Sequence, residues 1–180
     1  KNLALIFGNP APHSVLHDIY FSYEGNHREH RFWKVMREVG LINMNRGELD
    51  IKQKFFNLEY DSPFRLALEV IHTFPSSASD KKWSGVAGIE KLFGMKAIMD
   101  IEKVEKDRLN DFLSDFFEGG EESFVIFQKN AYNVIASNSY NLKMASEGKL
   151  FSKTKNKTIY GTPPTRWLYT NKMKNLLKTI

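Results

Sequence analysis

The sequence predicts an α/β fold, a three-layer α/β/α sandwich with a central four-stranded, mainly parallel sheet. Short apolar runs alternate along the chain with segments whose apolar residues recur at helical spacing, which is typical of strands joined by crossover helices. The chain has 180 residues, of which 42% are hydrophobic, enough for one domain with a buried core and too few to expect two. We therefore expect residues 1–180 to form a single domain.

Four apolar runs are the predicted strands. The first, residues 3–7, ends in Gly8-Asn9-Pro10, a pattern that indicates a buried parallel strand leading into a loop. The other three are residues 66–71, 123–127 and 158–160. In parallel sheets covered on both faces, ligands bind beyond the carboxyl ends of the strands. The loops that follow these runs are therefore where functional residues are expected.

Four segments carry helical patterns. Residues 31–40 place apolar side chains at helical spacing, and Gly40 is expected to end that helix. Residues 89–117 contain at least one helix, with an expected buried stripe of Ile101, Val104, Leu109, Phe112, Leu113 and Phe116. Residues 130–136 and those from about 171 onward are also predicted helices, whereas 137–156 are expected to form a long surface loop.

The composition excludes several kinds of site. The chain has no cysteine, which rules out disulfides, thiolate zinc sites and cysteine-ligated iron–sulfur clusters within these residues. Its apolar runs stay well short of the roughly 18 consecutive residues of a membrane helix. We expect a cytoplasmic protein, and a monomer, that does not associate with membranes.

Charge is unevenly distributed along the chain, whose net charge is +5. From Asp100 to Glu122 nine acidic residues face three basic ones, whereas from Lys143 to Ile180 nine basic residues face one acidic residue. A basic C-terminal part favours binding of a polyanion on one side of the molecule. An ordinary lysine-rich surface would give the same counts.

Three segments carry a resemblance to a known family. They are Leu5-Ile6-Phe7-Gly8-Asn9-Pro10-Ala11-Pro12-His13-Ser14, then His30-Arg31-Phe32-Trp33-Lys34-Val35-Met36, and finally Phe127-Gln128-Lys129-Asn130-Ala131-Tyr132. In order and spacing they resemble the uracil-DNA glycosylase superfamily, nearest its mismatch-specific and thymine-DNA glycosylase branch. The matching family features are the first active-site motif, an Asn-Arg-Phe-Trp-Lys-Val helix and a Gly-Lys-x-Ala-Tyr strand-to-helix junction.

The resemblance implies a monofunctional DNA glycosylase acting in base excision repair. Such an enzyme hydrolyses the N-glycosidic bond of a flipped-out deaminated or mispaired base, with uracil as the first candidate. Asn9 stands where the family places the residue that orients the attacking water. Because an amide is a poor base, we expect slower catalysis than an Asp would give. The first motif has no lysine for a Schiff base, so strand cleavage is not expected.

The resemblance also implies a base pocket. Gly8 and Pro10 would flank Asn9 there, Phe21 or else Tyr23 would stack on the base, and Gln128 would contact its Watson–Crick edge. Each of these positions also has a structural alternative, in the core or as a satisfied strand end.

The second motif of the family departs from its usual form. Thr162 replaces the usual His or Asn, so a second catalytic contact would come from a neutral hydroxyl, which argues against strong uracil excision of the classical kind. Arg166 or Trp167 would enter the duplex in place of the flipped base. The full set of expected DNA contacts is His13, Ser14, Lys129, Thr165, Arg166, Trp167 and Lys172.

Two other functional classes remain open on the sequence. A non-catalytic nucleic-acid or nucleobase binding module that kept the fold is favoured by the replacement at Thr162. A small-molecule α/β enzyme is the third reading, although no glycine-rich phosphate loop supports it. The glycosylase reading implies damaged or mismatched DNA as the partner, association with the nucleoid in a prokaryote, and no metal or organic cofactor.

Overall fold

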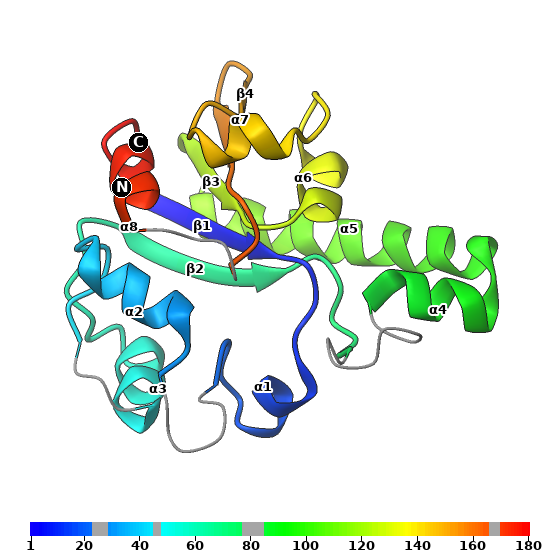
Figure 1. The fold of residues 1–180 in the computed structure, drawn as a ribbon, viewed down its shortest axis with the longest axis horizontal. Coiled ribbons are helices and arrows are strands. Elements are labelled where there is room, and N and C mark those ends of the chain that lie inside the picture. Colours follow the sequence, from blue (N-terminus) through cyan, green and yellow to red (C-terminus); the bar gives the residue numbers. More distant parts are fainter. Residues whose placement is uncertain (23–28, 45–47, 77–84, 166–169) are drawn as a thin grey trace.

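The computed structural model describes residues 1–22, 29–44, 48–76, 85–165 and 170–180. In this part of the chain a five-stranded sheet is flanked by helices (Figure 1). The strands are β1 (Asn2–Phe7), β2 (Arg65–Val70), β3 (Glu122–Ile126), β4 (Phe151–Lys153) and β5 (Lys157–Gly161). The helices are α1 (Pro12–Leu16), α2 (Arg31–Glu38), α3 (Glu48–Phe56), α4 (Gly85–Phe93), α5 (Met95–Phe117), α6 (Lys129–Ile135), α7 (Leu142–Ser146) and α8 (Thr170–Leu177).

The sheet is mixed and mostly parallel, which confirms the predicted α/β class. Its strand order is β2-β1-β3-β5-β4, with every pair parallel except β4 and β5. The four predicted strands are all present, but the prediction of a four-stranded sheet was wrong. Residues 137–156, expected as a surface loop, contain α7 and the antiparallel edge strand β4. Three residues are too few to show a recognisable alternation of apolar and polar side chains, so the sequence did not predict β4. The strand is defined by its antiparallel pairing with β5.

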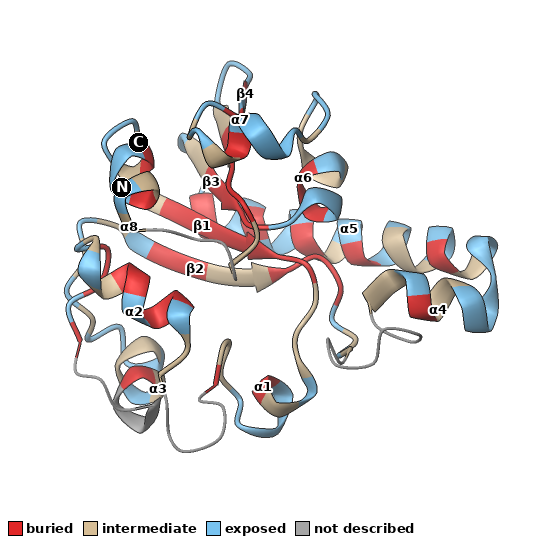
Figure 2. Cartoon of the chain, viewed as in Figure 1, coloured by how far each residue is buried: buried red, intermediate tan, exposed pale blue. Residues whose placement is uncertain are grey.

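Two apolar cores lie on opposite faces of the sheet because successive side chains of a strand point to opposite sides. Leu3, Leu5 and Phe7 of β1 join the core made with α2, α3 and α8. Ala4 and Ile6 of the same strand join the core made with α5 and α6. β1 is therefore buried on both faces from Leu3 to Phe7 (Figure 2). Because β1 is packed on both faces, the start of the loop that follows it is held firmly in place.

The expected buried stripe of α5 was only partly right. Leu109, Leu113 and Phe116 are buried, whereas the side chains of Val104 and Phe112 are 68% and 37% exposed. The first half of α5 extends with α4 past the carboxyl end of β2, so only its second half packs on the sheet (Figure 1). Among the described residues, no helix is both long enough and apolar enough to cross a membrane.

Candidate functional site

Four loops follow the carboxyl ends of the parallel strands, and backbone hydrogen bonds link the loops after β1 and β2 to each other and the loop after β5 to the end of β3. After β1 and β2, the amide of His72 donates to the Gly8 carbonyl at 2.9 Å, and the amide of Ser76 donates to the Pro10 carbonyl at 3.1 Å. After β5, the amide of Thr162 donates to the Ile126 carbonyl at 2.9 Å. The loops that the sequence placed at one edge of the sheet therefore do lie side by side.

Asn9 is half-buried, and its side-chain amide is oriented by the loop after β2. Its Nδ2 donates to Oγ of Ser76 and lies 3.5 Å from the Phe74 carbonyl oxygen. Because both contacts use the nitrogen, Oδ1 is the atom left to accept a hydrogen bond from a ligand or a water. The side chain of Asn9 can therefore offer an acceptor to a bound molecule.

The loop after β2, which contacts Asn9 through Ser76, is itself held by residues of α5. Both the amide and the hydroxyl of Thr73 donate to Oε1 of Glu105, at 2.7 and 2.6 Å. Arg108 donates to the other oxygen of Glu105 at 2.8 Å and to the Val70 carbonyl at 2.6 Å. Burial alone would raise the pKa of Glu105, but the hydrogen bonds from Thr73 and Arg108 outweigh it and lower that pKa. Glu105 therefore acts as a buried carboxylate anchor for this loop.

Gln128 lies against the residue that precedes Asn9. A Cβ on Gly8 would overlap the side-chain amide of Gln128, so only glycine leaves room for this contact. Gln128 is otherwise exposed, and it directly precedes α6. Two carboxamides, from Asn9 and Gln128, thus flank the backbone of Gly8. Such a pair offers donors and acceptors suited to a planar polar ligand.

Thr162 is at the same edge but is turned inward. It is 4% exposed, and its hydroxyl lies within hydrogen-bond distance of the carbonyl oxygens of Ile126, at 3.2 Å, and Pro163, at 3.3 Å. Its own carbonyl accepts a hydrogen bond from the Tyr140 hydroxyl at 3.0 Å. The side chain of Thr162 is thereby occupied by the protein backbone, so a direct contact from its hydroxyl to a ligand would require these bonds to break.

Phe21 belongs to a cluster of aromatic rings below the loop after β1. Its ring stacks on Phe32 with centroids 4.5 Å apart, lies 4.7 Å from His30 and meets the edge of Phe7 at 4.9 Å. Its φ of 56° is the left-handed conformation that is uncommon for an aromatic residue. Phe21 is half-buried, so part of its ring stays accessible, but the ring contacts already made give it a core role as well.

The remaining expected residues fall into four groups. Lys129 is exposed beside Gln128, and Thr165 follows the loop after β5. Pro10 and Ser14 line a cavity described below, while His13 is half-buried in α1. Lys172 lies on α8, which packs near the amino end of β1 (Figure 1), so the structure does not bring it to the carboxyl edge. Tyr23, Arg166 and Trp167 lie outside the described residues.

The basic C-terminal stretch does not form one surface at this edge. Lys153 and Lys157 belong to the β4–β5 hairpin at the amino end of β5, and Lys157 pairs with Glu122 at 3.1 Å. Because Thr162 follows the other end of β5, these lysines lie at the opposite edge of the sheet. The sequence could not reveal this, because it does not show that β5 runs between Lys157 and Thr162 and so places them at opposite ends of the strand.

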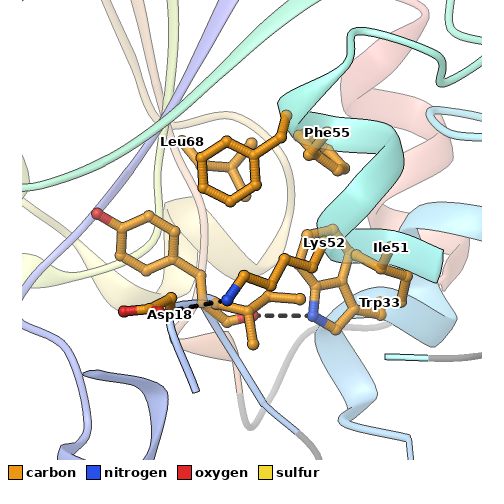
Figure 3. A pocket seen from close by; sticks show the side chains of 9 residues that line it. Asp18, Trp33, Ile51, Lys52, Phe55 and Leu68 are labelled. Atoms are coloured by element: carbon orange, nitrogen blue, oxygen red, sulfur yellow. Dashed lines mark hydrogen bonds and ion pairs between the residues drawn. The ribbon is translucent and has the colours of Figure 1, made fainter. Parts of the chain in front are cut away.

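Two pockets open on either side of the segment from Asp18 to Tyr20. The apolar pocket, of about 260 Å³, is lined mainly by side chains of α3, with Trp33 from α2 and the Lys52–Asp18 ion pair at 3.2 Å (Figure 3). Trp33 Nε1 donates to the Tyr20 carbonyl at 2.9 Å and fixes the segment between the pockets. The second, which we call the acceptor-lined cavity, has about 340 Å³ and lies between α1 and the end of β2.

His72 is a buried group that the sequence did not single out. It is 2% exposed, and neither ring nitrogen has a hydrogen-bond partner among the described residues. Burial disfavours the imidazolium form and lowers the pKa of His72, although the carboxylates of Glu102 and Glu105 oppose this. His72 is therefore neutral in the folded protein near neutral pH.

The residues that position Asn9 had no signal in the sequence. Ser76 is 67 positions away from Asn9, and Glu105 is 32 positions away from Thr73.

Among the described residues, no three His, Asp or Glu side chains gather where a metal ion could bind. Comparison with models of known protein families found no match, and comparison with curated proteins found no similar sequence. The interpretation of this edge therefore depends on its own geometry.

Proposed function

We propose that the protein is a DNA glycosylase that hydrolyses the N-glycosidic bond of a flipped-out deaminated or mispaired base. One observation carries the proposal: Asn9, in the segment that resembles the first active-site motif, has its amide nitrogen fixed by Ser76, which leaves Oδ1 as an acceptor at the carboxyl edge. Gln128, from the third resembling segment, lies beside it against Gly8. A mainly parallel sheet with helices on both faces, the layering expected of this fold, also supports the proposal.

In this mechanism the residues have separate roles. Oδ1 of Asn9 accepts a hydrogen bond from the attacking water and aligns it with the anomeric carbon, while the amide of Gln128 binds the edge of the base. As the water oxygen bonds to the anomeric carbon and the N-glycosidic bond breaks, the proton of the water passes to solvent, because the amide of Asn9 is a poor base. The base departs with the electron pair of the broken bond as an anion and is protonated from solvent, without a strong donor from Thr162. Because no charged group assists at Thr162, we expect slow turnover and a preference for bases that are good leaving groups.

A non-catalytic nucleic-acid or nucleobase binding module is the second candidate. The observation that favours it is the inward-facing hydroxyl of Thr162, which is bonded to backbone carbonyls at the position of the second motif. Such a module would use the same two carboxamides to bind a base without cleaving it.

A base-excision assay separates the two functions. Duplex and single-stranded oligonucleotides carrying uracil, thymine opposite guanine, hypoxanthine or xanthine are incubated with the protein, and alkaline cleavage reveals abasic sites. We expect release of at least one base, lost in Asn9→Ala and retained in the control Asn57→Ala, which changes an exposed asparagine away from this edge. Retained DNA binding without release of any base would instead establish the binding module.

A further inference from the structure

The acceptor-lined cavity lies beside the candidate site, and its polar lining consists of carboxylates and hydroxyls. Two carboxylates, of Asp18 and Glu69, and three hydroxyls, of Ser14, Tyr20 and Thr73, line it, with no lysine, arginine or histidine among the lining residues. Its other walls are apolar, from α1, Ile19 and the end of β2. Each carboxylate has a basic partner outside the lining, Lys52 for Asp18 and Arg108 for Glu69. A ligand with its own hydrogen-bond donors and an apolar body would suit the acceptor oxygens that these partners leave.

Ser14 gives an independent sign that the cavity takes a ligand. Its residue is 6% exposed, yet its side-chain hydroxyl makes no hydrogen bond to another described residue, and it lines the cavity. The hydroxyl is therefore open to the cavity and available to bond a ligand there.

Glu69 is the fixed acceptor of the cavity. Its Oε1 accepts from the Val70 amide at 2.8 Å and lies 3.3 Å from a guanidinium nitrogen of Arg108, and its side chain is 15% exposed. Burial first, and then the nearby carboxylate of Glu69, raise the pKa of Tyr20, so its phenol stays protonated and faces that carboxylate. The carboxylate is thus held in place before any ligand arrives, which lowers the entropic cost of binding.

We propose that the acceptor-lined cavity binds a small ligand whose amino or amidinium group, carried on a flat apolar body, donates hydrogen bonds to Glu69 and Ser14. The volume of about 340 Å³ limits the body to one or two rings. Two sources share this chemistry, a free aromatic amine and the exocyclic amino group of a nucleobase in a nucleic acid. The inference does not depend on base excision.

Calorimetric titration with benzamidine, an aromatic amidinium, is the direct test. We expect saturable binding at one site per chain and no detectable binding of benzyl alcohol, which has the ring without the cation. Glu69→Gln should weaken benzamidine binding by about tenfold or more, because a charge-assisted hydrogen bond is lost. Glu122→Gln, at the opposite edge of the sheet and also ion-paired, should leave binding unchanged.

Ser14→Ala keeps the test informative if Glu69→Gln disturbs the contact with Arg108. It should retain the native circular dichroism spectrum, because Ser14 has no side-chain bond to lose among the described residues, and weaken benzamidine binding by a smaller factor, about threefold. Absence of saturable benzamidine binding by folded protein would overturn the proposal, as would equal affinity in Glu69→Gln and Glu122→Gln.

A competition arm distinguishes the two sources of ligand. If the amino group belongs to a nucleobase, benzamidine should displace a bound cytosine- or adenine-containing oligonucleotide but leave binding of an all-thymine one unchanged. If the ligand is a free amine, benzamidine should bind without displacing either oligonucleotide. Both results support the cavity, and neither depends on whether a base is released.

Discussion

Two Gly-X-Pro turns lie at the carboxyl ends of β1 and β5, which are separated by β3 in the sheet, and their polar residues have opposite environments. Gly8-Asn9-Pro10 follows β1 and Gly161-Thr162-Pro163 includes the end of β5. Asn9 is half-buried, with its nitrogen bonded and its oxygen left over, whereas Thr162 is buried and its hydroxyl faces backbone carbonyls. The same local pattern at the same edge therefore gives one side chain suited to a ligand and one suited to holding the backbone.

The cause of this difference lies in what packs against each turn. The loop after β2 approaches Asn9 with a hydroxyl and a carbonyl, which orient its amide without covering it. The Thr162 turn instead lies beside β3 and under Tyr140, and these contacts enclose its side chain. Functional availability at this edge is therefore set by neighbouring loops more than by the turn itself.

The largest expected effect is a difference in the rate of base release between a substitution at Asn9 and one at Thr162. Asn9→Ala should lower the rate of base release on the order of hundredfold or more, because it removes the acceptor that aligns the water in the proposed mechanism. Thr162→Val, which keeps the shape and removes the hydroxyl, should change that rate by less than about threefold. Single-turnover assays on the same oligonucleotide measure both. An equal loss in the two variants would show that Thr162 also acts on the reaction.

The glycines of the two turns should differ in their effect on stability. Gly161→Ala would drive a methyl group into the buried side chain of Leu150 and to 3.0 Å from the ring of Tyr132. We expect it to lower the free energy of unfolding by about 1–3 kcal/mol in urea denaturation. Gly8→Ala should cost less, since it displaces only the exposed end of Gln128. Similar losses in both variants would contradict the difference in packing.

A smaller effect on activity should come from the residue that orients Asn9. Ser76→Ala removes the acceptor for Nδ2, so the amide can rotate and present either atom. We expect kcat for base release to fall by about three- to tenfold with KM unchanged, and Ser76→Thr to restore it. A fall in DNA affinity instead of kcat would indicate that Ser76 contacts a phosphate.

The smallest expected effect is a dependence of the free energy of unfolding on pH, which arises from His72 in the loop after β2 and from Glu105, which contacts that loop. The pKa of His72 is lowered in the folded state, so the unfolded chain binds a proton more readily, and stability falls as pH falls below about 6.5. The pKa of Glu105 is also lowered, so its contribution is present above pH 4.5 and is lost as pH falls below it.

Urea denaturation at a series of pH values distinguishes these two groups. His72→Leu should flatten the loss of stability that begins near pH 6.5 and leave the one below about pH 4.5, whereas His17→Leu, at an exposed imidazole, provides the control. If the first loss persists in His72→Leu, another group causes it.

Local patterns in the sequence predicted most of the fold. The apolar runs located β1, β2, β3 and β5, and helical spacing located α2, α6 and α8 to within a few residues. Gly40 directly follows Val39, the C-cap of α2, as expected of a helix stop, and its φ of 75° favours glycine. The pattern could not locate the short edge strand β4 or identify Val104 and Phe112 as exposed residues of α5, because both depend on what lies beside them.

The sequence by itself determined that the chain is an α/β domain and that the loops after its strands are the place to look, because periodicity fixes strand and helix and parallel strands share one edge. Tertiary structure alone decided that Ser76 orients Asn9, that Glu105 anchors the loop at Thr73, and that Thr162 faces inward. These contacts join residues 32 to 67 positions apart. Hydrogen bonds at such separations depend on the packed arrangement of whole elements, which no local pattern of residues contains.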